Sequence, residues 1–186
     1  MRSHGMRAKA ARDSLRGLAL GDGFGERWFF RSPGEAVEMI RRREAPTEAT
    51  WRWTDDTAMA LSVVAVLRDR GTIDGERLAA AFAAAYQADP GRGYGSGMHQ
   101  LLPVLAEDPA GWREHARGLF GGEGSLGNGA AMRVAPLGAW FHDDPERAAA
   151  EAAASAEVTH AHPEGIAGAV AVALAPAVLP VLVLVA

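Results

Sequence analysis

The chain has 186 residues, a formal net charge of −4 and 48% hydrophobic residues. This length fits a single domain with a sizeable core. The absence of cysteine excludes disulfides, thiolate catalysis and cysteine-ligated zinc. The acidic balance gives no reason to expect a nucleic-acid partner, since the one basic run, Arg41–Arg43, is more typical of a helix end. Met1–Arg16 lacks a continuous apolar stretch, so no secretory signal is predicted and the expected location is cytoplasmic.

The hydrophobic pattern predicts an all-α fold, because helical spacing recurs along the chain and sustained period-two alternation does not. Gly21 is expected to end the first helix and Gly21–Gly25 to form a tight turn. Thr54 is expected to cap the third helix and Gly71 to close it. The predicted helices are Ala8–Leu20, Glu35–Arg43, Asp55–Arg70, Glu76–Gln87, Met98–Glu107, Gly111–Phe120, Ala130–Phe141 and Pro145–Glu157.

The last segment, Gly165–Ala186, carries no charged side chain. It is predicted to be a buried helix with Pro163 in its first turn, followed from about Pro176 by an irregular apolar end. Pro176 and Pro180 favour that reading because proline interrupts helical hydrogen bonding. About 20 apolar residues can cross a bilayer, so a membrane span is the alternative, but the glycine- and alanine-rich first half is only weakly hydrophobic. We therefore expect one domain over residues 1–186, with a diverged tail at 176–186 and no membrane partner.

Thr54, Asp55, Asp56 and Thr57 form the most informative motif of the chain. Two adjacent carboxylates flanked by hydroxyls supply several of the oxygen ligands that Mg²⁺ prefers. The alternative is purely structural, since Thr54 suits an N-cap and acidic residues in a first turn favour the helix dipole.

A glycine-rich loop, Gly124–Gly129, precedes an apolar segment and contains Ser125 and Asn128. Backbone N–H groups in such a loop can meet an anion, and the two polar side chains suit sugar hydroxyls or a phosphate. The loop lacks the Gly-Lys-Ser/Thr of a Walker motif, and no strand precedes it as in a dinucleotide fingerprint. A flexible surface loop is the alternative.

Three further features are candidates for the same site. His160 and His162 lie in a turn and are weak as a zinc site, so one of them contacting a ligand with the other solvated is the better functional interpretation. An N-cap region with exposed histidines is the structural alternative. Gly93–Gly97 is a second permissive loop that could line a pocket. Glu26 could face a metal, whereas Asp22 is expected only to cap or to bond backbone in its turn.

The order of these motifs resembles the ADP-ribosylglycohydrolase family, the relatives of dinitrogenase-reductase-activating glycohydrolase, over roughly Ala8–Leu174. The motifs are the Gly-Asp segment after the first helix, Thr-Asp-Asp-Thr, Arg-Gly-Tyr-Gly-x-Gly, Gly-Ser-x-Gly-Asn-Gly-Ala-Ala-Met-Arg and a Thr-His turn. The resemblance implies a compact all-α domain with a Mg²⁺ or Mn²⁺ site, usually binuclear. It also implies hydrolysis of the glycosidic bond to the distal ribose of ADP-ribose on a protein or small-molecule substrate.

Carried over to this chain, the resemblance assigns metal binding to Thr54, Asp55 and Asp56. It assigns contacts with ADP-ribose to Gly95, Ser125, Leu126, Gly127, Asn128 and His160. A carboxylate would act as general acid or base, and Glu26 and Asp56 are the candidates. Two hard cations could polarise ribose hydroxyls and orient a water for attack.

Two departures from the family pattern shape the expected activity. Phe29 stands where family members commonly have a glutamate, so Glu26 is the nearest substitute. The family's second metal motif, Asp-x-Asp-Thr, does not occur after Thr57. The chain therefore resembles the N-terminal part of the family domain, and we expect weak metal binding and weak or no hydrolysis. A module that binds ADP-ribose without cleaving it, and a membrane-anchored or partner-dependent fragment, are the alternatives.

Overall fold

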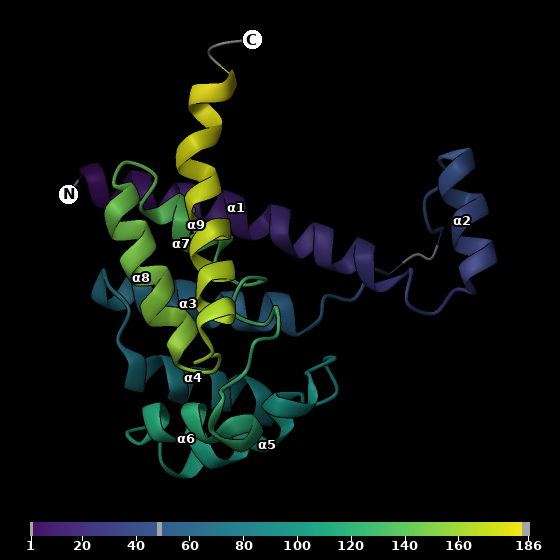
Figure 1. Cartoon of the computed structure of the whole chain (residues 1–186). Coiled ribbons are helices and arrows are strands. Elements are labelled where there is room, and N and C mark those ends of the chain that lie inside the picture. Colours follow the sequence, from purple (N-terminus) through teal and green to yellow (C-terminus); the bar gives the residue numbers. More distant parts are fainter. Residues whose placement is uncertain (1, 48–49, 184–186) are drawn as a thin grey trace.

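The computed structural model describes residues 2–47 and 50–183, and within these ranges the fold is all-α, as predicted, without a strand. The elements are α1 (Arg2–Glu26), α2 (Pro33–Arg42), α3 (Asp55–Arg70), α4 (Gly75–Ala88), α5 (Ser96–Glu107), α6 (Trp112–Gly118), the 3-10 turn η1 (Leu119–Gly122), α7 (Ala135–Trp140), α8 (Pro145–Glu157) and α9 (Pro163–Val183). Helix α3 crosses the middle of the molecule, with α4, α5 and α6 on one side and α7, α8 and α9 on the other (Figure 1).

The core is made by apolar faces that meet at α3. Met59, Val63 and Leu67 of α3 are fully buried, and Phe82 of α4 and Leu137 of α7 pack in the same cluster. On the far side, α7 and α9 approach so closely that a Cβ at Gly138 would collide with the carbonyl oxygen of Ala173. Small residues on these helices thus let the two backbones pack closely. This packing fixes the positions of the loops that precede α7 and α9.

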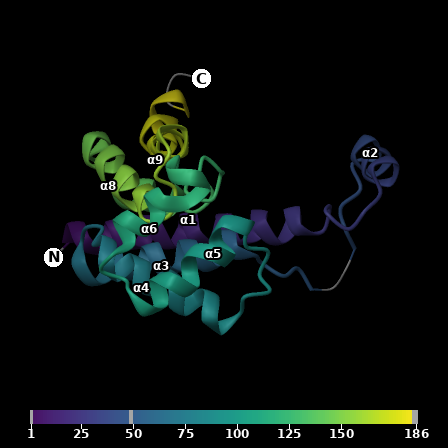
Figure 2. The same ribbon diagram turned by 60° about the horizontal axis from the view of Figure 1, so that its bottom comes forward.

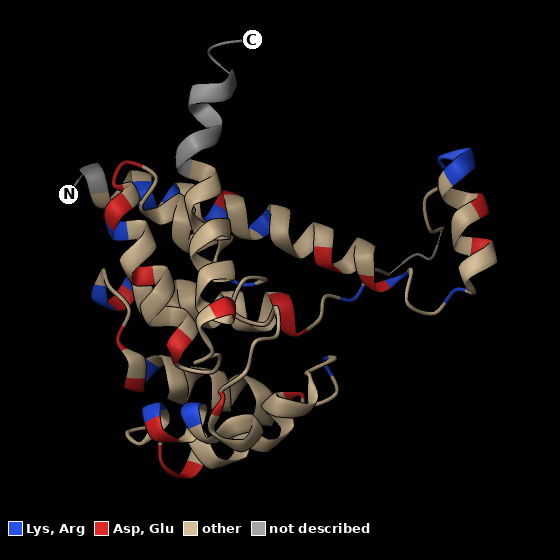
Figure 3. Ribbon diagram, in the orientation of Figure 1, with Lys and Arg blue, Asp and Glu red and all other residues tan. Residues whose placement is uncertain are grey.

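Helix α2 stands away from the rest of the molecule (Figure 2). It has no buried residue, and Val37 and Ile40 on it are exposed. Ser32 caps it by accepting a hydrogen bond from the backbone N–H of Glu35, and Pro33 occupies its first turn. Its last turn carries basic residues, whereas elsewhere acidic and basic positions are interspersed along the helices (Figure 3).

The predicted end of the first helix at Gly21 and the turn over Gly21–Gly25 are wrong, because α1 continues to Glu26. A glycine in a helix costs about 1 kcal/mol relative to alanine. Tertiary contacts offset that cost: Gly23 lies against Trp51, and Asp22 bonds to the start of α3. A local reading of the glycines could not include these contacts.

The predicted helix Ala130–Phe141 is also wrong in its first half, because α7 begins only at Ala135. Residues 130–133 form turns that direct Arg133 into the core. The predicted helix Gly111–Phe120 is shorter as well, since α6 ends at Gly118 and a 3-10 turn follows with Phe120 at a φ of 54°. The bounds predicted for α3 and α8 are confirmed.

The final helix begins at Pro163, as predicted, but it continues past Pro176 and Pro180 to Val183. Each proline removes one N–H donor, and the other backbone bonds are enough to carry the helix on, as also around Pro103 inside α5. The irregular end predicted from Pro176 is therefore wrong up to Val183, and residues 184–186 of that tail lie outside the described residues. In the part of the chain that the structure covers, no helix is long and apolar enough to cross a membrane.

Candidate active site

One cavity of about 1060 Å³ brings together all of the predicted site residues. They come from the end of α1, the start of α3, the loop before α5, the loop after η1 and the turn before α9. In chain order they are Glu26, Thr54, Asp55, Asp56, Gly95, Ser125, Leu126, Gly127, Asn128 and His160. The volume is sufficient for a nucleotide-sized ligand.

Asp22 anchors the acidic side of this cavity. From α1 its carboxylate accepts hydrogen bonds from the Thr54 N–H (2.8 Å), the Thr54 hydroxyl (2.7 Å), the Thr57 N–H (3.2 Å) and the Thr57 hydroxyl (2.6 Å). Two of these donors are backbone groups at the start of α3, which have no partner within the helix. Asp22 therefore caps α3 from another helix, whereas the predicted partners were backbone groups of its own turn.

Thr54 is the N-cap residue of α3 by its extended backbone, but its side chain does not cap the helix. Its hydroxyl donates instead towards carboxylate oxygens of Asp22 (2.7 Å) and Asp56 (3.1 Å). The predicted side-chain cap is thus wrong, because the Asp22 carboxylate is the stronger acceptor and already satisfies the helix end. Thr54 still lines the cavity.

Asp55 and Asp56 carry the unusual electrostatics of the site. Burial and the neighbouring Asp56 carboxylate raise the pKa of Asp55 to about 6. Burial and the Asp22 carboxylate also raise the pKa of Asp56. Among the residues described, no ion pair joins these three carboxylates to an arginine, lysine or histidine. Negative charge is therefore concentrated here without an ion-paired cation among the described residues, although Arg52 and Arg92 line the same cavity and Arg133 acts on Asp55 at longer range. Such a cluster is suited to a bound cation.

The loop before α5 is tied to the acidic motif through Arg92. The carbonyl of Arg92 accepts a hydrogen bond from the Asp55 N–H (2.8 Å), and its guanidinium donates to the carbonyl of Trp53 (2.9 Å). The same guanidinium lies 3.7 Å from the centre of the Trp53 ring. Gly93, at a φ of 90°, lets this loop pass close to Asp55. This attachment places Gly95 at the cavity wall. The contacts of Arg92 with residues 53–55 were not predicted from the sequence, because the partners are far apart in the chain.

The glycine-rich loop forms another part of the cavity wall. Ser125 is buried and its hydroxyl accepts a hydrogen bond from the Gly127 N–H (3.3 Å), whereas Leu126 and Asn128 are exposed. His160 lies beneath the loop: a Cβ at Gly129 would come within 2.7 Å of its Nε2. His162 also lines the cavity, and its Nδ1 accepts from the Glu164 N–H (3.1 Å). Glycine at 129 is thus needed for the loop to approach the imidazole.

The donors at the start of α3 match the chemistry of Mg²⁺ or Mn²⁺ in kind but not in number. Thr54, Asp55 and Asp56 offer oxygen ligands, and the unpaired carboxylates favour a cation. Within the described part of the chain, however, no three His, Asp or Glu side chains form a group that could hold a metal ion. The residues fit part of a metal site.

The comparisons with known proteins agree with this geometry. The family model described as ADP-ribosylglycohydrolase matches residues 4–181, and the chain belongs to this family. It is 35% identical over 179 residues to "ADP-ribosylhydrolase ARH3" of Homo sapiens, covering 88% of this chain and 48% of that protein. It is 28% identical over 160 residues to "ADP-ribosyl-[dinitrogen reductase] glycohydrolase" of Rhodospirillum rubrum, covering 79% of this chain and 50% of the relative. The chain thus spans about half the length of these curated relatives.

Proposed function

We propose that the chain binds ADP-ribose in this cavity and supports hydrolysis of the glycosidic bond between its distal ribose and a protein side chain or small molecule. The observation that carries the proposal is the single cavity. Part of its lining is a glycine-rich loop suited to an anion, and another part is a carboxylate cluster that forms no ion pair among the described residues. The names of its relatives, which describe hydrolysis of ADP-ribosyl groups, support the same reaction class.

The charge distribution suggests how the ligand would be oriented. The pyrophosphate is an anion, and the carboxylates of Asp55 and Asp56 would repel it. The loop Gly124–Gly129 offers backbone N–H groups instead, with Ser125 and Asn128 beside them. We therefore expect the phosphates at the loop and the distal ribose towards the start of α3.

Thr54, Asp55 and Asp56 would hold a divalent cation, and such an ion would supply a Lewis acid next to the ribose. Glu26, at the end of α1, lines the same cavity and is the candidate general acid or base together with Asp56. Because the acidic ligands come from one end of α3 and do not form a group of three, we expect weak affinity for the metal and slow hydrolysis.

A module that binds ADP-ribose without cleaving it is the second candidate. Two observations favour it. The described residues offer too few metal ligands for the reaction, whereas the glycine-rich loop and the buried His160 that would contact the ligand are present. Binding would then be independent of Mg²⁺ and no product would form.

Calorimetric titration of ADP-ribose with and without Mg²⁺ tests both candidates. Saturable binding that is strengthened by Mg²⁺ in the wild type and not in Asp56→Asn supports the proposed site. Asp69→Asn is the matched control, because Asp69 is an exposed carboxylate near the other end of α3. Release of free ADP-ribose from an ADP-ribosylated peptide, dependent on Mg²⁺ and on Asp56, would establish hydrolysis. Saturable binding that ignores Mg²⁺, with no release, would favour the binding module.

A further inference from the structure

Arg133 is fully buried, and among the described residues no carboxylate forms an ion pair with it; the Asp55 carboxylate acts on it only at longer range. Its guanidinium donates to the carbonyl of Gly129 (3.1 Å), the hydroxyl of Thr159 (2.9 Å) and the carbonyl of Ser155 (2.7 Å), and it lies 4.4 Å from the centre of the Phe82 ring. Burial lowers its pKa to about 9. Burying a cation is costly even when it is hydrogen-bonded, and an apolar side chain of similar volume often costs less, so we look for a role that only its N–H donors can fill. The contacts of Arg133 show what that is.

Thr159 connects Arg133 to His160. The Thr159 hydroxyl lies 2.8 Å from Nδ1 of the His160 ring, and all three side chains are buried. Arginine can only donate, so the hydroxyl oxygen accepts from Arg133 and its own hydrogen remains for Nδ1. Within the described residues this hydroxyl has no other hydrogen-bond acceptor. Nδ1 is therefore an acceptor, and the proton of the neutral imidazole is on Nε2.

Nε2 faces the glycine-rich loop. A Cβ at Gly129 would lie 2.7 Å from Nε2, and one at Gly127 would lie 3.6 Å from it. No acceptor for Nε2 is found among the residues that the structure describes, although His160 is only 4% exposed. Nε2 is not among the buried polar atoms that lack a partner, and His160 lines the cavity, so this nitrogen is open to the cavity. A donor that borders a cavity without a protein partner is suited to an acceptor atom on a ligand.

We propose that Arg133 and Thr159 are positioning residues that hold His160 as the neutral Nε2–H tautomer, so that this N–H is presented to an oxygen of the nucleotide held by the loop Gly124–Gly129. The ligand in this statement rests on the proposed function. Burial, with the nearby charge of Arg133, lowers the pKa of His160 to about 3, so the ring stays neutral and donates through one nitrogen only. The chain of donors fixes which nitrogen it is.

Nitrogen-15 NMR of the imidazole of His160 in the free protein tests the tautomer directly. We expect a protonated Nε2 and an unprotonated Nδ1 in the wild type and in Thr159→Ser, which keeps the hydroxyl. Thr159→Val has a similar shape but no hydroxyl, so the ring should take both tautomers. A wild-type ring protonated on Nδ1, or a tautomer that Thr159→Val does not change, would overturn the proposal.

Calorimetry with ADP-ribose measures what the tautomer does for binding. We expect Thr159→Val to weaken binding about 3- to 10-fold, the size of one hydrogen bond, and Thr159→Ser to restore it. His160→Gln places an amide nitrogen near the position of Nε2 and should bind better than His160→Asn, which places it near Nδ1. Equal weakening by both variants would contradict the role of Nε2.

Thr72→Val is the matched control for loss of a part-buried hydroxyl. Thr72 bonds to Glu151 away from the cavity, so this variant should lower stability and leave both the tautomer and ADP-ribose binding unchanged. If the folded wild type does not bind ADP-ribose at all, the proposed function and the ligand contact fail together. The NMR measurement on the free protein still decides the positioning role in that case.

Discussion

Helix α3 is held at both ends by a carboxylate from another helix, but among the described residues only the carboxylate at its C-terminal end forms an ion pair. At its start, Asp22 accepts the N–H and hydroxyl groups of Thr54 and Thr57. Just beyond its other end, Glu151 of α8 accepts the hydroxyl of Thr72 (2.6 Å) and the N–H of Ile73 (2.6 Å). The two arrangements use the same chemistry, a carboxylate that satisfies a backbone N–H and a threonine hydroxyl.

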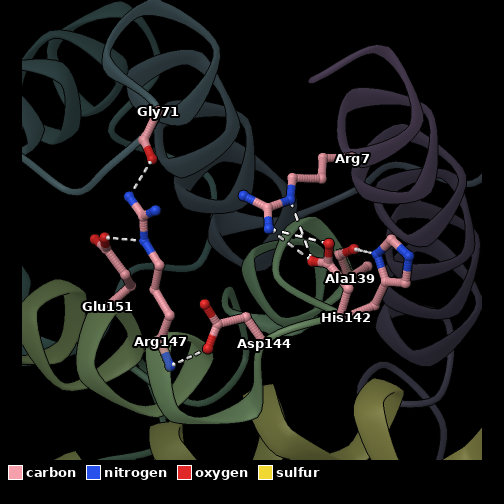
Figure 4. A network of polar contacts seen from close by, with 8 residues as sticks. Arg7, Gly71, Ala139, His142, Asp144, Arg147 and Glu151 are labelled. Carbon is pink, nitrogen blue, oxygen red and sulfur yellow. Dashed lines mark hydrogen bonds and ion pairs between the residues drawn. The ribbon is translucent and has the colours of Figure 1, made fainter. Parts of the chain in front are cut away.

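The difference lies in what surrounds each carboxylate. Arg147 donates to Glu151 (3.4 Å) and to the carbonyl of Gly71 (3.0 Å), so the charge at this end is paired (Figure 4). At the other end, Asp55 and Asp56 add negative charge beside Asp22, and the cavity opens there. The same type of anchor is thus structural where a cation accompanies it and becomes part of a candidate site where none does.

The largest expected effect on stability comes from the C-terminal end of α3, where Glu151 is paired with Arg147. Glu151→Ala should lower the free energy of unfolding by about 2–4 kcal/mol, because it leaves the part-buried donors of Thr72 and Ile73 and the charge of Arg147 without their acceptor. Urea denaturation would measure it. ADP-ribose binding by the folded fraction should not change, and a loss of binding would mean that the two ends of α3 are coupled.

A substitution at the start of α3, beside the cavity, should lower stability less and ligand binding more. Asp22→Asn replaces one acceptor oxygen by an N–H₂ donor, which should cost about 1–3 kcal/mol. Relief of repulsion with Asp56 offsets part of that loss. Because the start of α3 would shift, Mg²⁺-dependent binding of ADP-ribose should be lost, and calorimetry would detect this. If Asp22→Asn lost as much stability as Glu151→Ala and still bound ADP-ribose with Mg²⁺ dependence, the distinction between the two ends of α3 would be contradicted.

The buried His160 across the cavity predicts a pH dependence. Its pKa falls from 6.5 to about 3 on folding, so between these values the unfolded chain binds more protons and stability is lost as pH falls. From pH 6.5 to 5 this contributes about 1–2 kcal/mol. The difference in unfolding free energy between wild type and His160→Gln, measured in urea at several pH values, should therefore shrink by that amount. A difference independent of pH would mean that the ring titrates normally in the folded protein.

The smallest effects separate two glycines of the loop. A Cβ at Gly129 would lie within 2.6 Å of the His160 ring, so Gly129→Ala should cost about 1–2 kcal/mol and weaken ADP-ribose binding. At Gly127 the nearest atoms lie at 3.5 and 3.6 Å, an ordinary contact, so Gly127→Ala should change stability by less than about 0.5 kcal/mol. Thermal unfolding and calorimetry of the pair would test the close approach. Equal effects of the two substitutions would contradict it.

Where interactions were local, the sequence by itself determined the structure. The bounds of α3 and α8 follow from apolar content, an acidic first turn and a terminal glycine or proline. Pro163 at the start of α9 follows from its fixed φ. The family, the all-α class and the residues that line the cavity could also be predicted, because a few motifs in a fixed order carry them.

Tertiary structure decided the features whose partners are distant in the chain. Gly21–Gly25 stays helical because Asp22 and Gly23 find partners in residues 51–57, which outweighs the low helix propensity of glycine. Arg133 interrupts the predicted helix Ala130–Phe141 because its guanidinium bonds inward to Ser155 and Thr159. A lone charge in that apolar run was the one local signal of a buried network. The hydrogen-bond partners of Arg133, which position His160 in the cavity, are set by the packing of α7, α8 and α9 and not by any local pattern.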